Sequence, residues 1–224
     1  MSHPVVLALP FTERWLVQNS PARRVPSHGT DLFGGRFAID FVGVDERGRT
    51  AGERDWGTLF GTEPPERFFA FGRPILAPAD GVVVAVHDGE PDHEARRSQL
   101  ALVGYMLGQA ARARQGVGAI AGNHVVIAMR EGDAFVALVH LQAGSLRMGV
   151  GDAVATGQQL ASCGNSGNST QPHVHVQLMD GPDPNVAKGV PMAFRAYREW
   201  PARAREPRLV DAGIPAEGAV VEPL

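Results

Sequence analysis

The chain has 224 residues, enough for one large domain or two small ones. Its formal net charge of -3 argues against nucleic acid as the main partner, and its single cysteine, Cys163, excludes an internal disulfide. No apolar run is long enough to span a bilayer, and the opening segment MSHPVVLALPFTERW lacks the basic and apolar regions of an export signal. A cytoplasmic chain is the default expectation, unless the true start lies further upstream; the oligomeric state stays open.

Short apolar segments, separated by Gly and Pro, follow one another along the chain and predict β-strands. In chain order they are RFAIDFVGV (36–44), GVVVAVHD (81–88), NHVVIAM (123–129), FVALVHL (135–141) and HVHVQL (173–178). Short strands at such close spacing, with turn residues between them, predict an all-β sandwich or barrel.

Three segments depart from this pattern. Residues 91–116 are rich in Ala, Leu, Arg and Gln, and their apolar side chains recur at helical spacing (Leu100, Val103, Leu107 and Ala111), which predicts one helix inserted between strands. Residues 45–67 are charged and Gly-rich and predict a long loop, a kind of segment that is often functional. The tail from about residue 200 receives no assignment.

The segment QPHVHVQL (171–178) carries two histidines two residues apart. Alternate residues of a strand point to the same face, so His173 and His175 share one face, while Val174 and Val176 face a core. Such a pair is either an ordinary surface feature or part of a metal site, because imidazole is the commonest metal-binding side chain. The pair alone does not decide between them.

Several segments in a fixed order resemble the lysostaphin-like zinc metallopeptidases, bacterial enzymes that cut the peptide bridges of peptidoglycan. These segments are PILAPADGVVVAV, GNHVVI, FVALVHL and MGVGDAVATGQQLASCGNSGNSTQPHVHVQL. The resemblance covers residues 26–180 and implies one peptidase domain spanning 1–224, with a tail at about 200–224. It also implies a mainly β fold, an antiparallel sandwich of the duplicated hybrid type, and action in the cell envelope.

The resemblance further implies one zinc ion held by a His, an Asp and the second His of His-x-His. Carried onto this sequence, the second His is His175, and the aspartate of the AIDF segment is Asp40. The first His of the pair, His173, and the His of FVALVHL, His140, are implied to do acid–base work. Two His and one Asp leave one position of a tetrahedral zinc site for water, whose pKa the metal lowers toward neutrality.

The remaining ligand is where the chain departs from the family pattern. The family usually has His four residues before the Asp, but this chain has Arg36 there, and Arg does not give up its proton to bind a metal. His28 is the nearest upstream candidate. If DLFGG (31–35) is a turn between strands 25–30 and 36–43, the register places His28 and Asp40 on one face. Asp31 is the rival carboxylate.

Other interpretations compete with the peptidase. Arg36 favours a binding or regulatory protein on the same fold that has lost hydrolysis. The segments ADGVVV and VGDAVATGQQL also resemble carrier and phosphotransferase barrels, but a carrier needs a lysine at a hairpin tip, and Lys188, the only lysine, lies elsewhere. A thiol nucleophile at Cys163 is disfavoured by its small-residue turn. His124 is expected to pack, and His87 to be solvated.

Overall fold

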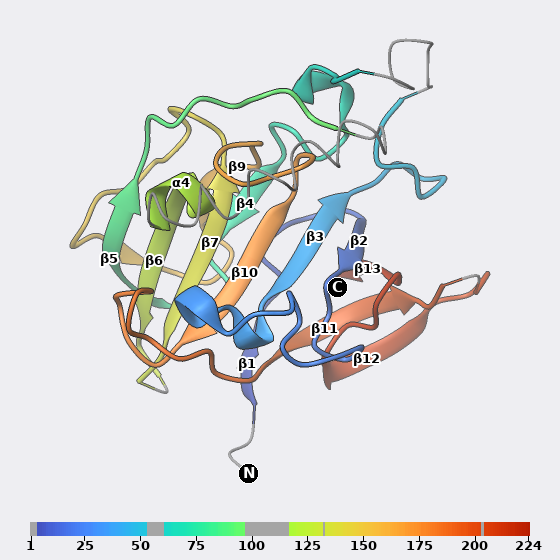
Figure 1. Ribbon diagram of the computed structural model, residues 1–224. Coiled ribbons are helices and arrows are strands. Elements are labelled where there is room, and N and C mark those ends of the chain that lie inside the picture. Colours follow the sequence, from blue (N-terminus) through green and yellow to red (C-terminus); the bar gives the residue numbers. More distant parts are fainter. Residues whose placement is uncertain (1–3, 53–60, 97–116, 132, 203) are drawn as a thin grey trace.

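The structure is a computed structural model that describes residues 4–52, 61–96, 117–131, 133–202 and 204–224 (Figure 1). It is mainly β, as the sequence predicts. The strands are β1 (Val5–Leu7), β2 (Trp15–Gln18), β3 (Ile39–Gly43), β4 (Pro74–Leu76), β5 (Gly81–His87), β6 (Asn123–Met129), β7 (Phe135–Leu141), β8 (Ala153–Val154), β9 (Gln159–Ser162), β10 (Val174–Met179), β11 (Met192–Trp200), β12 (Arg208–Gly213) and β13 (Val220–Pro223).

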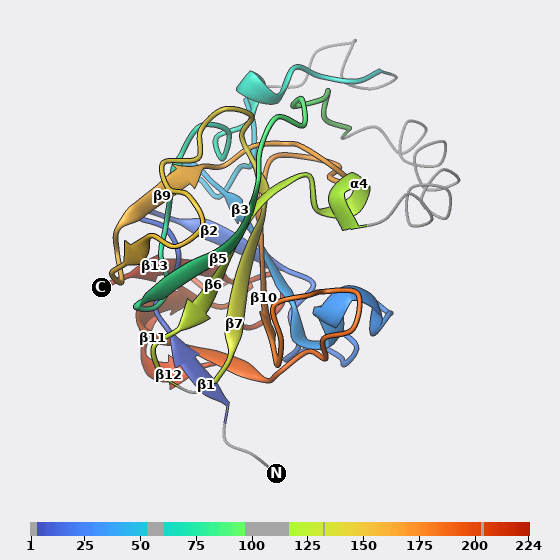
Figure 2. The ribbon, with the colours of Figure 1, turned by 90° about the vertical axis from the view of Figure 1, so that its left-hand side faces the viewer.

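Eleven of these strands form one sheet in the order β1-β11-β13-β2-β3-β10-β7-β6-β5-β8, with β12 also paired to β11. Among the described strand pairs, only β1–β11 is parallel, so the expected antiparallel pairing is confirmed for most of the sheet. Strands β4 and β9 form a separate pair. This pair lies on the opposite side of the large sheet from α4 (Val117–Ala121) (Figure 2).

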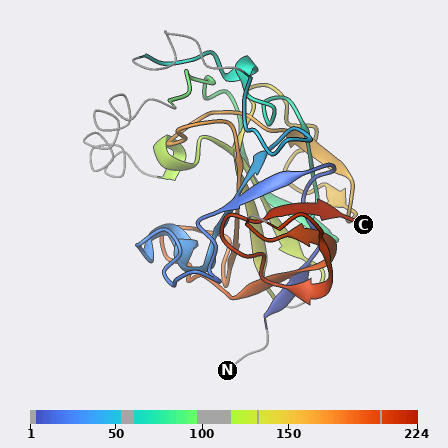
Figure 3. The same ribbon diagram turned by 90° about the vertical axis from the view of Figure 1, so that its right-hand side faces the viewer.

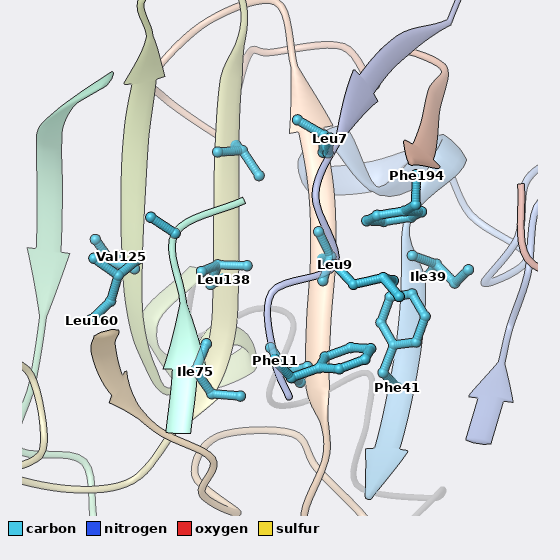
Figure 4. Packing of buried hydrophobic residues seen from close by; sticks show 14 of the residues in the cluster. Leu7, Leu9, Phe11, Ile39, Phe41, Ile75, Val125, Leu138, Leu160 and Phe194 are labelled. Carbon is cyan, nitrogen blue, oxygen red and sulfur yellow. The ribbon is translucent and has the colours of Figure 1, made fainter. Parts of the chain in front are cut away.

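The core lies between the large sheet and the β4–β9 pair. Ile75 of β4 and Leu160 of β9 pack over Val125 and Leu138 of the sheet (Figure 4). All four side chains are fully buried, and burial of one such side chain contributes roughly 1.5–3 kcal/mol. The central strands therefore have one face committed to the core, and their other face carries histidine side chains beside a smaller apolar cluster.

Strand β10 shows how the sequence produces these two faces. Val174 and Val176 are fully buried in the core cluster, whereas His175 is only partly buried on the opposite face. The alternation expected for HVHVQL is therefore confirmed. It aims His175 and Gln177 away from the core, where the site can form.

Two short 3₁₀ helices also belong to the described fold, η1 (Leu32–Phe37) and η2 (Pro65–Arg67). Residues 91–96 contain no helix, because Ala95 pairs with Glu63 through backbone hydrogen bonds, and the rest of the helix predicted at 91–116 lies outside the described residues. The described parts of 45–67 contain η2 and no strand. No described helix is long and apolar enough to cross a membrane.

The sheet extends beyond the predicted core at both ends of the chain. Strand β13 pairs with β2, and β11 pairs with β1, so the C-terminal segment and the N-terminal strands lie side by side (Figure 3). The tail that received no assignment from the sequence thus forms β12 and β13. These strands continue the same sheet on the far side of β2.

Candidate active site

A row of cross-strand neighbours crosses the sheet on the face opposite the core. Asp40 of β3 lies opposite His175 of β10, and His175 lies opposite Val139 of β7. The row continues to His124 of β6 and His87 of β5. Directly opposed residues of an antiparallel pair share a face, so this single row brings side chains from five strands to one surface.

A bulge in β7 adds His140 to this surface. Asn123 of β6 pairs with Leu141 while the next residue, His124, pairs with Val139, so His140 is the extra residue of β7. Its φ of 64° is a left-handed conformation that is uncommon for a residue with a side chain. Such a bulge changes the direction in which the side chain of the extra residue points. It explains why His140 lies beside His173, with ring centroids 4.6 Å apart.

His28 reaches the same surface from the loop before η1, and not from a hairpin strand. Residues 25–30 form turns, and Phe33 and Gly34 both have positive φ (57° and 73°), so DLFGG makes an irregular 3₁₀ segment. The predicted hairpin is therefore wrong, although His28 and Asp40 do come together. Gln177 donates a hydrogen bond from Nε2 to the Phe33 carbonyl oxygen (2.8 Å), which fastens this segment to β10.

Three side chains meet at the Asp40 carboxylate. His28 Nε2 lies 3.0 Å from Oδ2, and His175 Nδ1 lies 2.9 Å from Oδ1. One ligand-type atom from each of these residues lies within 4.8 Å of those of the other two. Asn19 donates from Nδ2 to Oδ2 (2.8 Å), which orients the carboxylate from the end of β2. The group has the size and the atom types of a metal-binding site.

Charge in this group is arranged in pairs. Burial would raise the pKa of Asp40, but the neighbouring His28 and His173 reverse this and hold the pKa of that carboxyl well below its usual range. Burial would likewise lower the pKa of His28, but the Asp40 carboxylate outweighs it and raises the pKa of the imidazole. A buried carboxylate that stays ionised needs a cation beside it, either a proton on the histidines or a metal ion.

Hydrogen bonds fix which nitrogen of each histidine faces inward. His175 Nε2 lies 3.0 Å from Gln177 Oε1, which leaves Nδ1 toward Asp40. His28 Nδ1 lies 3.0 Å from Ser27 Oγ, which leaves Nε2 toward Asp40. In histidines that bind metals, an oxygen partner on the outer nitrogen likewise orients the ring and turns the inner nitrogen toward the metal.

His140 and His173 are oriented in the same way through backbone carbonyls. His140 Nδ1 donates to the Ser166 carbonyl oxygen (2.9 Å), and His173 Nδ1 donates to that of Gln171 (2.8 Å). Neither Nε2 atom has a hydrogen-bond partner among the described residues, and that of His173 lies 3.8 Å from Asp40. Burial lowers the pKa of both histidines, that of His140 strongly, so both are neutral at neutral pH and can accept a proton.

Arg36, the residue at the usual ligand position, is not part of this group. Its Nη1 lies 2.8 Å from both carboxylate oxygens of Asp31, and the two side chains are exposed. Arg36 and the rival carboxylate Asp31 thus pair with each other and not with the histidines. Cys163 is fully buried, and burial raises the pKa of its thiol, which removes the thiolate that a cysteine nucleophile needs.

A cleft of about 400 Å³ opens beside the histidines and includes His28, His140 and His175 in its lining. His124 also lines it, packed as expected but in the cleft, with its ring 5.6 Å from that of His87. The position of His124 was missed because it depends on strand register. Gln177 was missed too, although its place two residues after His175 on one strand face is a usable signal.

Comparison with known proteins gives a family. The model of peptidase family M23 matches residues 67–187, more than half of the chain, a range that contains His140, His173 and His175. No curated protein matches the chain.

Solved structures with low identity also match. The catalytic domain of the antimicrobial peptidase lysostaphin from Staphylococcus simulans is 16% identical (TM-score 0.40), with 80% of this chain and 88% of that chain covered. The catalytic domain of the prophage-encoded M23 protein EnpA from Enterococcus faecalis is 20% identical (TM-score 0.40), with 85% and 91% covered. A zinc-containing peptidase from Vibrio cholerae is 18% identical (TM-score 0.37), with 84% and 37% covered.

The family match rests on the segment that carries the His-x-His strand and the strand of His140, which are also the segments that the sequence singles out. This chain therefore belongs to peptidase family M23, and it is a peptidase.

Proposed function

We propose that the chain is a zinc-dependent endopeptidase that hydrolyses peptide bonds in peptidoglycan, in its cross-bridges or its stem peptides. The observation that carries the proposal is the group formed by His28, Asp40 and His175, with the free nitrogens of His140 and His173 beside it. Three protein ligands with an open fourth position are the usual arrangement of catalytic zinc.

The residues present fit zinc in their chemistry. Two imidazole nitrogens and one carboxylate oxygen are ligands that Zn²⁺ accepts. The buried, ionised Asp40 needs a positive charge beside it, which the ion would supply. When bound, zinc supplies a Lewis acid that polarises a carbonyl group and lowers the pKa of water. In this proposal His28, Asp40 and His175 hold the ion, and Gln177, Ser27 and Asn19 hold the ligands.

The acid–base work falls to His140 and His173. Both are neutral imidazoles whose Nδ1–H is engaged by a backbone carbonyl, so only Nε2 can accept a proton. One of them takes the proton of the attacking water, and the protonated ring then stabilises the developing oxyanion or returns the proton to the leaving amine. Such general acid–base catalysis contributes typically 10²–10⁴-fold to a rate.

The peptidoglycan part of the proposal rests on the resemblance of the strand segments around His140 and His175 to lysostaphin-like peptidases. It places the action of the protein at the cell envelope. A binding protein without hydrolysis is not favoured, because its motivating feature was Arg36, and Arg36 pairs with Asp31 while His28 occupies the position next to Asp40.

The experiment measures zinc content and hydrolysis on the same samples of purified protein. We expect about one zinc per chain, loss of turbidity and release of new amino groups from bacterial cell walls, inhibition by a chelator and recovery with zinc. Asp40→Asn should abolish both metal binding and hydrolysis, whereas Asp31→Asn, a surface carboxamide control, should preserve both. Hydrolysis that survives complete removal of metal would contradict the zinc assignment. Zinc bound without any hydrolysis would return the protein to the binding class.

A further inference from the structure

The cleft beside His175 has an apolar floor built from the sheet itself. Val139 lies opposite His175, and Ala137 lies opposite Gln177, both on β7. Ala137 in turn lies opposite Val126 of β6. These three side chains line the cleft and share the face of the histidine row, because they occupy alternate positions of their strands.

The walls are largely apolar, with Thr30 and Asn168 as polar members of the lining. Leu32 and Phe33 border the cleft from η1, and Ile120 and Ala121 border it from α4. Leu32 is 62% exposed, although a Leu of this kind loses free energy by remaining in water. Leu32 lines the same cleft as three of the active-site histidines. An apolar substrate group packed against Leu32 would remove this side chain from water.

The lining lacks the charges that a charged side chain would need. Of the described residues that line the cleft, the only ionisable ones are the histidines His28, His124, His140 and His175. A lysine side chain placed on this floor would lose its hydration without gaining an opposite charge from the described residues that line the cleft. The cleft therefore disfavours a charged, lysine-like substrate side chain.

Size gives the second part of the selectivity. The cleft volume of about 400 Å³ lies within the range of about 300–1,000 Å³ that is usual for sites that enclose a ligand. Ala137 is the smallest residue of the floor, and it is a diagonal cross-strand neighbour of His175, at about 7–8 Å. A glycine in the substrate would leave this apolar space empty.

We propose that this cleft is a side-chain subsite that selects an uncharged aliphatic residue next to the scissile peptide bond, with Ala137 as the specificity-determining residue and Leu32 as its outer wall. The inference rests on the proposed function, because it assumes that hydrolysis takes place at His140, His173 and His175. It names the substrate class more narrowly, as a peptide with a leucine-like residue flanking the cut and not a glycine-only bridge.

The test is a set of internally quenched peptides presented to the zinc-loaded protein. The peptides are identical except for Gly, Leu or Lys on one side, and then on the other side, of the bond that is cut in a randomised peptide library. At one of the two positions we expect kcat/KM for Leu to exceed that for Gly and for Lys by at least about tenfold, since a single methylene in a fitted pocket is worth about 10–200-fold.

Variants connect the preference to the cleft. Ala137→Leu fills the floor and should lower the Leu-to-Gly ratio of kcat/KM at least about tenfold. Leu32→Ser should lower the same ratio. Because Leu32 is exposed, this variant is expected to fold even if Ala137→Leu disturbs the packing of the sheet. Leu209→Ser is the matched control, because Leu209 is also an exposed leucine (69%) but lies on β12. It should leave the ratio unchanged.

Each outcome has one meaning. Equal cleavage of the Leu, Gly and Lys peptides by the wild-type protein overturns the inference and leaves the proposed function intact. So does a Leu preference that both Ala137→Leu and Leu32→Ser retain. Cleavage of no peptide in the library by zinc-loaded protein contradicts the proposed function, and the inference fails with it.

Discussion

At the scale of single residues, the roles around Asp40 divide by the nitrogen that each histidine turns inward. His175 presents Nδ1 because Gln177 holds Nε2, and His28 presents Nε2 beside the same carboxylate. His140 and His173 present Nε2 because backbone carbonyls hold Nδ1. Two histidines thus contact the carboxylate closely, whereas the other two border the space beside it.

We predict that His28→Ala weakens zinc binding far more than Arg36→Ala does. His28 is one of three proposed ligands, so its loss should exceed the 10–100-fold in metal affinity that is usual for loss of a supporting partner. The Arg36 side chain pairs with the exposed Asp31 and lies over the ring of Phe37. Neither contact involves Asp40, so loss of the Arg36 side chain should change zinc affinity by less than about twofold. Competition with a chromogenic zinc chelator measures both. Unaltered zinc affinity in His28→Ala would remove this residue from the site.

We predict that His140→Ala and His173→Ala retain zinc and lose about 10²–10⁴-fold in kcat, because both are assigned to proton transfer and neither to the metal. Zinc content and cleavage are measured on the same preparations. His87→Ala is the control, since His87 belongs to the same cross-strand row but does not line the cleft. A variant of His140 or His173 that cleaves at the wild-type rate would refute the role of that residue.

At the scale of elements, the site depends on loops that are fixed to strand β7. Asn123, fully buried at the start of β6, accepts from the Glu90 amide and donates to the carbonyl oxygens of Glu90 and Leu141. Ser166 Oγ accepts from the Asn123 amide and donates to the Leu141 carbonyl. The Ser166 carbonyl oxygen accepts a hydrogen bond from His140 Nδ1. The network therefore connects the bulge of β7 to the segment after β9.

We predict that Asn123→Ala lowers the free energy of unfolding by about 1–3 kcal/mol, the cost of leaving buried backbone groups without partners. Urea denaturation of the metal-free protein measures the change without any contribution from zinc. Asn185→Ala is the control, because Asn185 lies in an exposed turn and its only partner among the described residues is Asp183. Its free energy of unfolding should stay within about 0.5 kcal/mol of the wild-type value. Equal stability of the two variants would show that the network does not hold the fold.

The elements that the sequence predicted best are those in which periodicity and core burial agree. In β10 the valines and histidines alternate, and the structure buries the valines. The hairpin before β3 was wrong because DLFGG contains two residues in left-handed conformations, Phe33 and Gly34, and a Phe gives no local signal for such a conformation. The bulge at His140 also gives no local signal in the sequence, since it is defined by the register between β7 and β6.

Across the whole molecule, the face of the sheet that carries the site could be predicted from the sequence, but the surroundings of the site could not. The proximity of His28 to Asp40 depends on the contact between Gln177 and Phe33, which joins residues 144 positions apart. The C-terminal strands also escaped prediction, because their isolated valines pair with β2 and β11 and show no clear alternation of their own. Such long-range pairings are decided by tertiary packing, which no local pattern encodes.

Anomalous scattering at the zinc absorption edge, from crystals of the zinc-loaded protein, tests whether a single zinc site lies at His28, Asp40 and His175. We expect one strong peak about 2.0–2.2 Å from His28 Nε2, a carboxylate oxygen of Asp40 and His175 Nδ1. A strong peak elsewhere, for example between His87 and His124, with none at Asp40, would contradict it.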